Sequence, residues 1–182
     1  DCFTGVSIML MDQGMDTGPI LQQKQVVIGE SVTAFDLTNK LFMLGANMLV
    51  DLIPLWIDGS INPTKQDNIQ VSYTSKIVKQ DGRIRWNESA EVISRKVRAY
   101  TPWPGTFSTW RGKNFKLLSV KVSDLLSTKE LGKLSGSLIE GLYVSTRQGV
   151  LEIERLQIEG KQPISPKEFM LGYPDFDKDV LT

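Results

Sequence analysis

The stretch Gly5–Gly18, which reads GVSIMLMDQGMDTG, decides how the N-terminal part of the chain folds. It begins with an apolar run over residues 6–11 and ends in a loop in which Gly14 separates Asp12 from Asp16. A strand that releases into such a loop places carboxylates at the edge of a sheet, and glycine lets the backbone approach a flat ligand closely. The alternative is an ordinary hairpin turn, because aspartate and glycine also tolerate turn geometry. The spacing alone leaves both interpretations open.

The segments that surround this loop predict part of a sheet covered by a helix. Residues 6–11 and 20–28 are typical of strands. Ser31 or Thr33 is expected to cap a helix that ends near Asp58, with one apolar stripe packed on a sheet. Two strands and one helix cannot form a stable sheet alone. We therefore expect residues 1–60 to be the C-terminal part of a doubly wound, Rossmann-like α/β domain whose earlier strands lie upstream.

A polar stretch over residues 61–75 is expected to be a linker, after which the pattern of the sequence changes. Asp81-Gly82 predicts a turn before a short strand over 83–86, and Asn87 is expected to cap a helix over 88–100. Further strands are predicted over residues 106–110, 114–122, 135–139, 142–145 and 150–158, with a last helical turn over 166–171. Several short strands and one main helix indicate a small OB-like β-barrel over residues 76–182.

Composition excludes several classes of protein. The chain has 182 residues, no histidine and one cysteine, so an internal disulfide is impossible and a zinc site of the usual ligand types is not expected. No metal is predicted. No apolar run approaches the roughly 18 to 20 residues of a membrane span, so no membrane partner is expected.

The net charge of zero hides an asymmetry along the chain. Residues 1–60 contain two basic and seven acidic side chains, whereas residues 76–161 contain sixteen basic and nine acidic ones. The basic block predicts contact with a polyanion, and the alternative is a solvated surface.

The loop sequence MDQGMDTGPIL resembles the folate loop of the 10-formyltetrahydrofolate-dependent formyltransferases. The resemblance implies that Asp16 is catalytic, that 10-formyltetrahydrofolate is the formyl donor, and that the loop binds the pterin through Met11, Asp12, Gly14, Met15 and Gly18. Asp12 is expected to shape the loop rather than react. The family's other catalytic residues, an asparagine and a histidine, lie upstream of the region that matches. Since the chain has no histidine, it is expected to be part of a longer enzyme or to do no chemistry alone.

The second half resembles the C-terminal domain of the methionyl-tRNA formyltransferases. The matching stretches are YTSKI (73–77), DGRIRW (81–86), VRAYTPWPG (97–105), LQIEGK (156–161) and FMLG (169–172). The resemblance implies that initiator methionyl-tRNA is the acceptor and that Lys76 lies near it. Other tRNA-binding candidates, chosen by charge and position only, are Lys79, Arg95, Arg98, Lys113 and Lys116. Trp103 is interpreted as fastening the helix to the barrel.

The function expected from these resemblances is transfer of a formyl group to methionyl initiator tRNA, in a cytoplasmic or organelle-matrix protein for which a monomer is favoured. One alternative keeps the folate chemistry but changes the acceptor to another amine, such as an amino sugar, or to water, as in formyl-folate hydrolases. A second alternative is a non-catalytic tRNA-binding fragment. A purely structural domain, in which the basic residues do not gather on one face, is a third.

Overall fold

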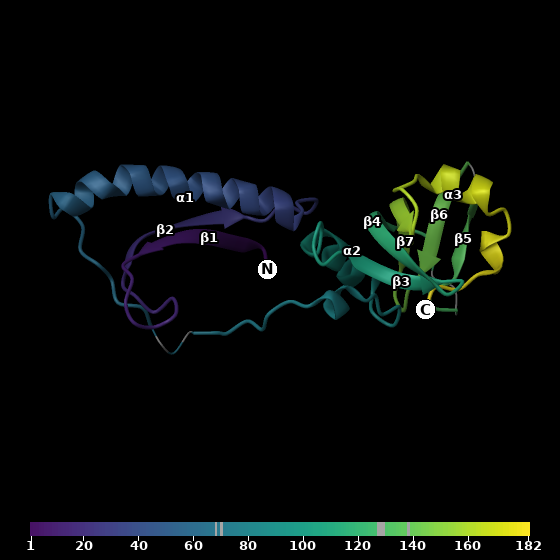
Figure 1. Cartoon of the computed structure of the whole chain (residues 1–182), viewed down its shortest axis with the longest axis horizontal. Helices are drawn as coiled ribbons and strands as arrows, with labels where there is room; N and C mark the ends of the chain where they lie inside the picture. Colours follow the sequence, from purple (N-terminus) through teal and green to yellow (C-terminus); the bar gives the residue numbers. More distant parts are fainter. Residues whose placement is uncertain (68, 70, 127–129, 138) are drawn as a thin grey trace. The chain divides into compact units, whose positions relative to one another are not determined.

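Two units, Asp1–Lys76 and Ile77–Thr182, make up the computed structural model of the chain (Figure 1). The structure describes residues 1–67, 69, 71–126, 130–137 and 139–182. Residues 68 and 70 of the predicted linker, and residue 138 of the predicted strand over 135–139, lie outside the described residues.

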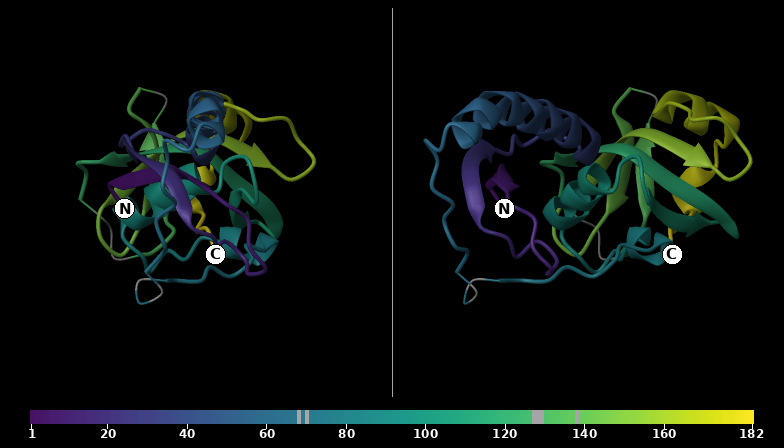
Figure 2. Two further views of the ribbon diagram at one scale, coloured as in Figure 1. Left: turned by 90° about the vertical axis from the view of Figure 1, so that its left-hand side faces the viewer. Right: turned by 60° about the vertical axis from the view of Figure 1, so that its left-hand side comes forward.

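The first unit is an antiparallel pair of strands with one long helix. β1 (Phe3–Met9) pairs with β2 (Ile20–Val27), and their register is irregular only between Ile8 and Met9. α1 (Ala34–Ile57) runs along this pair (Figure 2). Thr33 caps the helix in a capping box with Asp36, which confirms the predicted helix and selects Thr33 over Ser31. The sheet of this unit is one antiparallel pair of strands. The expected doubly wound sheet therefore stays a prediction.

α1 buries little of its apolar surface. Met48 and Leu52 are its buried side chains, whereas most of the predicted stripe is exposed, including Phe42 at 76% and Phe35 at 57%. By length and composition alone the helix could cross a membrane, with a mean hydropathy of 1.5 over its most apolar window. Central helices of larger soluble domains share these properties, so the helix by itself identifies neither environment.

The second unit is a mixed α/β domain built on a five-stranded antiparallel sheet. The strands are β3 (Thr106–Trp110), β4 (Lys113–Ser123), β5 (Leu134–Ser137), β6 (Gly141–Ser145) and β7 (Val150–Ile158). They are ordered β3-β4-β7-β6-β5 across the sheet. The helical elements are η2 (Lys79–Gly82), α2 (Ala90–Ala99), α3 (Pro166–Gly172) and η3 (Phe176–Lys178). The predicted strands after residue 105 and the last helical turn are thereby confirmed to within two residues of each boundary that the structure describes.

The core of the second unit lies between the sheet and its helices. Aromatic rings gather there edge to face, with Phe169 5.1 Å from Trp110 and 5.6 Å from Phe115 between ring centroids. α2 contributes Ala90, Ile93 and Val97, which are buried along one face of the helix. This core is far larger than that of the first unit, so the second unit carries most of the buried apolar surface.

Both edges of this sheet have backbone partners in the C-terminal segment 179–182. Thr109 of β3 exchanges two hydrogen bonds with Thr182, at 2.7 and 3.0 Å between nitrogen and oxygen. At the other edge, the Leu134 N–H of β5 donates to the Asp179 carbonyl at 3.2 Å, and the Leu181 N–H donates to the Gly132 carbonyl at 2.8 Å. The segment therefore joins the two edge strands, and the Leu181 side chain is 1% exposed.

Three expectations for the region between the linker and β3 are wrong. Residues 83–86 form no strand; Arg83 makes an isolated parallel bridge to Phe107 instead. The α2 cap is Ser89, because a turn at residues 86–87 delays the helix, so Asn87 does not cap it. Trp103 is 61% exposed, so it does not fasten the helix to the sheet.

Removing the Leu181 side chain should destabilise the second unit. We expect Leu181→Ala to lower the free energy of unfolding by about 2–4 kcal/mol, because a fully buried leucine leaves a cavity between the two sheet edges. Urea unfolding followed by tryptophan fluorescence measures the change. The matched control is Leu126→Ala, whose side chain is 93% exposed and should change stability by less than about 0.5 kcal/mol. Equal losses of unfolding free energy in the two variants would contradict the view that segment 179–182 holds the two edge strands together.

Candidate functional site

The loop between β1 and β2 is organised by the carboxylate of Asp12. Its Oδ1 atom accepts hydrogen bonds from the Gly14 N–H at 3.0 Å and from the Thr17 hydroxyl at 2.7 Å. The Leu10 N–H donates to the Pro19 carbonyl at 3.0 Å and closes the base of the loop. This is the Asx-type geometry that aspartate favours in turns, so Asp12 fixes the path of the backbone.

A second clamp comes from Gln66, within the predicted linker. Its Nε2 atom donates to the Asp16 carbonyl at 2.8 Å and to the Gly18 carbonyl at 2.7 Å. Thr64 and Ile20 exchange two backbone hydrogen bonds of 2.8 Å, which bring Gln66 to the loop. Sequence reasoning missed Gln66, because a glutamine in a polar stretch carries no signal of a contact almost 50 residues away.

Glycine is required at one position of this loop. A Cβ atom at Gly18, which is buried, would lie 1.7 Å from the Leu10 carbonyl oxygen. Two backbone segments therefore touch here, which only glycine permits.

The structure places the six predicted residues in one loop and exposes the side chains of Met11, Met15 and Asp16. Asp16 has a φ of +57°, a left-handed conformation that is uncommon outside glycine. Its carboxylate is exposed, and among the described residues none donates a hydrogen bond to it. Met11 and Met15 are 93% and 76% exposed. A clamped backbone thus presents two apolar side chains and a free carboxylate, which suits an amphipathic, flat ligand.

The predicted basic residues lie on several different elements of the chain. They come from the end of the first unit (Lys76), from η2 (Lys79), from α2 (Arg95 and Arg98) and from β4 (Lys113 and Lys116). Arg95 lies 3.9 Å from Glu91 in an exposed ion pair. Lys113 and Lys116 are three residues apart on one strand, so they lie on opposite faces of the sheet.

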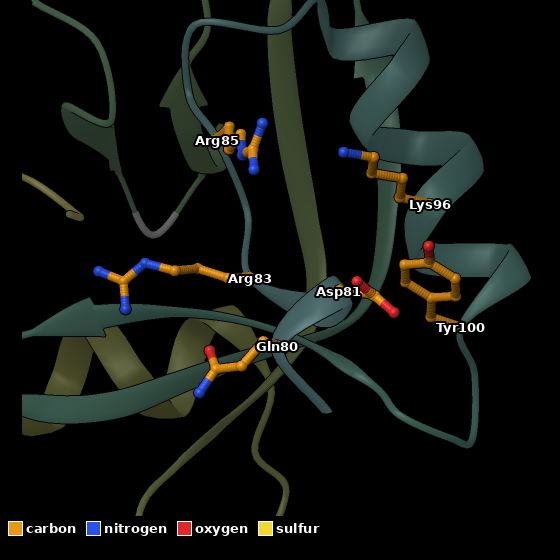
Figure 3. Close-up of a pocket in the computed structure, with 6 residues that line it drawn as sticks. All are labelled: Gln80, Asp81, Arg83, Arg85, Lys96 and Tyr100. Carbon is orange, nitrogen blue, oxygen red and sulfur yellow. The ribbon is translucent and has the colours of Figure 1, made fainter. Parts of the chain in front are cut away.

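An open pocket of about 440 Å³ lies between η2 and α2 (Figure 3). It is lined by Gln80, Asp81, Arg83, Arg85, Lys96 and Tyr100. Figure 3 shows Arg83 and Arg85 on the segment that follows η2, across from Lys96 and Tyr100. Arg83 and Arg85 were not among the predicted residues, although their alternation with Ile84 and Trp86 carries the signal that would have found them.

Among the described residues, no group of three histidine, cysteine, aspartate or glutamate side chains could hold a metal ion.

Comparison with family models matches both units. Residues 76–174 match the family described as formyl transferase, C-terminal domain, and residues 1–53 match the family described as formyl transferase.

Several relatives with similar sequences are named methionyl-tRNA formyltransferase. The chain is 38% identical over 173 residues to the methionyl-tRNA formyltransferase of Roseiflexus castenholzii, and 36% identical over 178 residues to that of Alkaliphilus metalliredigens. These matches cover 94% and 98% of this chain but 55% and 56% of the relatives, so the chain spans little more than half their length.

Similar solved structures show the fold. HypX from Aquifex aeolicus in complex with tetrahydrofolic acid matches with a TM-score of 0.69 at 20% identity, over 94% of this chain and 30% of HypX. The N-formyltransferase from Helicobacter canadensis matches with a TM-score of 0.65 at 21% identity, over 90% of this chain and 57% of that protein.

Removing the Gln66 clamp should loosen the loop. We expect Gln66→Ala to speed hydrogen exchange at the Leu10 and Gly14 amides by about tenfold, because two hydrogen bonds to the loop carbonyls are lost. Exchange measured by NMR reports each amide. The control is Gln22→Ala, an exposed position on β2. Unchanged exchange in Gln66→Ala would show that the Asp12 contacts hold the loop without it.

Proposed function

Because this chain belongs to the formyl transferase family, we propose that it is part of an enzyme that transfers a formyl group from 10-formyltetrahydrofolate to the amino group of methionyl initiator tRNA. The observation that carries the proposal is the 36–38% identity to methionyl-tRNA formyltransferases over more than nine-tenths of the chain. The chain covers little more than half of those relatives, so we expect further catalytic groups to come from polypeptide outside residues 1–182.

The loop between β1 and β2 is proposed to hold the folate donor. The tethered backbone around Gly14 and Gly18 would lie against the pterin, with Met11 and Met15 supplying apolar contacts and Asp12 keeping the loop in shape. The clamp by Gln66 supports this assignment, because a preformed loop loses less entropy on binding.

Asp16 is proposed as the catalytic residue of this chain. The free α-amine of the acceptor attacks the formyl carbon; the new C–N bond forms as the bond to the donor nitrogen breaks, and one proton passes from the amine to that nitrogen. A carboxylate next to the reacting groups can orient the group that transfers this proton, and it stabilises the positive charge that develops on that group as it takes up the proton. The exposed, unpaired Asp16 carboxylate is suited to that task.

The acceptor is proposed to be tRNA rather than an amino sugar. The relatives named methionyl-tRNA formyltransferase are 36–38% identical to this chain over more than nine-tenths of its length. The excess of basic over acidic residues in residues 76–161 also suits a polyanion. Lys76, Lys79, Arg95, Arg98, Lys113 and Lys116 remain candidate contacts.

Finer features of the architecture belong to the same proposal. We propose that residues 76–182 form an OB-like barrel closed through segment 179–182, which the hydrogen bonds at both sheet edges support. We propose that residues 1–60 complete a doubly wound domain, whose other elements would cover the exposed apolar side chains of α1, and that residues 61–75 link the domains. A monomer in the cytoplasm or an organelle matrix is proposed.

A formylation assay tests the function. The chain, joined to the N-terminal remainder of the Roseiflexus castenholzii relative, is mixed with methionyl initiator tRNA and 10-formyltetrahydrofolate. We expect activity, and we expect Asp16→Asn to lower kcat/KM by about 10²- to 10⁴-fold, because the reacting groups lose their carboxylate. Asp51→Asn, a similar change at an exposed position on α1, should have no such effect.

Two results would contradict the proposal. Formylation of an amino sugar nucleotide, but not of tRNA, would show that the acceptor is an amino sugar. Equal activity in Asp16→Asn and Asp51→Asn would show that Asp16 only shapes the turn.

A further inference from the structure

The segment that follows η2 presents two arginines on one side. Ile84 and Trp86 are buried at 4% and 7% exposure, while Arg83 and Arg85, which alternate with them, are exposed. The Ile84 N–H donates to the Phe107 carbonyl at 2.8 Å, and the Trp86 Nε1–H donates to the Ser108 hydroxyl at 3.0 Å. Because side chains alternate along an extended backbone, both arginines point outward, about 7 Å apart along the segment.

Strand register extends this surface across the sheet. Arg83 is bridged to Phe107 of β3, Phe107 lies opposite Lys116 of β4, and Lys116 lies opposite Gln157 of β7. Opposed residues share a face, and the neighbours of this row along β3 and β4 are buried in the core. The row therefore faces away from the core and carries the exposed side chains of Arg83 and Lys116 and the half-buried ones of Phe107 and Gln157, about 4.8 Å apart from strand to strand.

The cations of this surface are not neutralised. Among the described residues, Arg83, Arg85 and Lys116 have no ion-pair partner. Other cations nearby are paired: Lys96 Nζ donates to both oxygens of Glu88 at 2.7 Å. Arg111 bonds to Asp175 and Asp179, and the hydrogen bond from Arg111 lowers the pKa of Asp175.

One carboxylate lines the pocket, and it is engaged. The Asp81 Oδ2 atom accepts the Val78 N–H at 2.7 Å, at the start of η2. Its charge offsets one of the cations, so the surface made by Arg83, Arg85 and Lys116 stays positive.

We propose that Arg83, Arg85, Phe107 and Lys116 form an RNA-binding surface, in which the cations contact phosphates and the Phe107 ring stacks on an unpaired base. This deepens the proposed function and rests on it, since it names the part of the second unit that takes the tRNA. An aromatic ring between cations on a sheet face suits single-stranded nucleic acid, whose phosphates and base faces it meets together. Tyr100, on the far side of the pocket, offers a second ring.

Binding of labelled, uncharged initiator tRNA to the 182-residue chain, followed by fluorescence anisotropy between 50 and 200 mM salt, tests the surface. We expect the double variant Arg83→Ala, Arg85→Ala to bind about 10- to 100-fold more weakly at the lower salt concentration. The slope of log affinity against log salt should fall by about 1.4 to 1.8, because two phosphate contacts are lost.

A charge-matched control separates local contact from net charge. Lys121→Ala with Lys167→Ala also removes two exposed positive charges, from the distant end of β4 and from α3. It should weaken binding by less than about threefold. Phe107→Leu keeps apolar volume but removes the ring, so it should weaken binding by at least about fivefold with an unchanged salt slope. Thermal unfolding of each variant reports on its fold.

Several outcomes would overturn the surface without touching the function. These are equal losses in the arginine and lysine double variants, no effect of Phe107→Leu, or polyphosphate competing as well as single-stranded RNA of equal charge. If the joined enzyme formylates methionyl-tRNA while the arginine variant binds and reacts normally, the function stands and this surface falls. If neither formylation nor tRNA binding is found, both fall.

Discussion

A chain of hydrogen bonds from Trp86 through the buried Ser108 hydroxyl to the Thr182 carbonyl is the interaction on which the second unit depends. The indole N–H of Trp86 donates to the Ser108 hydroxyl at 3.0 Å, and that hydroxyl donates to the Thr182 carbonyl at 2.9 Å. Ser108 is fully buried, so breaking the chain would leave polar groups without water, at about 1–3 kcal/mol for each. Three segments far apart in the sequence are thereby held together: the one that carries the arginines, the edge strand β3, and the C-terminal segment.

The first unit is built on a different principle. Met48 and Leu52 are its buried hydrophobic side chains, and the loop between β1 and β2 is ordered by polar side-chain hydrogen bonds instead. The Asp12 carboxylate and the Gln66 amide make four hydrogen bonds to the loop, three of them to backbone atoms, so its shape is fixed where little apolar surface is buried. This division fits the proposals that the loop presents a backbone surface to the donor and that other elements of a larger domain cover the apolar side chains of α1.

Much of the second unit could be predicted because its strands alternate clearly between buried and exposed residues. Thr106–Trp110 and Val150–Ile158 match the predicted boundaries for this reason. Asn87 and Ser89 both have good capping side chains, and a turn that only tertiary contacts specify decides between them. The structural role predicted for Trp103 rests on the usual burial of tryptophan, but its exposure depends on a loop path that composition does not encode. In the site, the loop residues were visible as a motif, whereas Gln66 and the row through Phe107 required strand register and long-range contacts.

The partners found at the two sheet edges limit how the second unit can recognise anything. β3 is hydrogen-bonded on its outer side to Thr182 and Ile84, and β5 to the segment around Asp179. An incoming peptide therefore finds these backbone groups already occupied and cannot simply extend the sheet as an added strand. Recognition is left to side chains on the outer surface, where single substitutions can change partner choice without disturbing the pairing of the strands. A fold of this kind can exchange one acceptor for another over evolution while its frame stays the same.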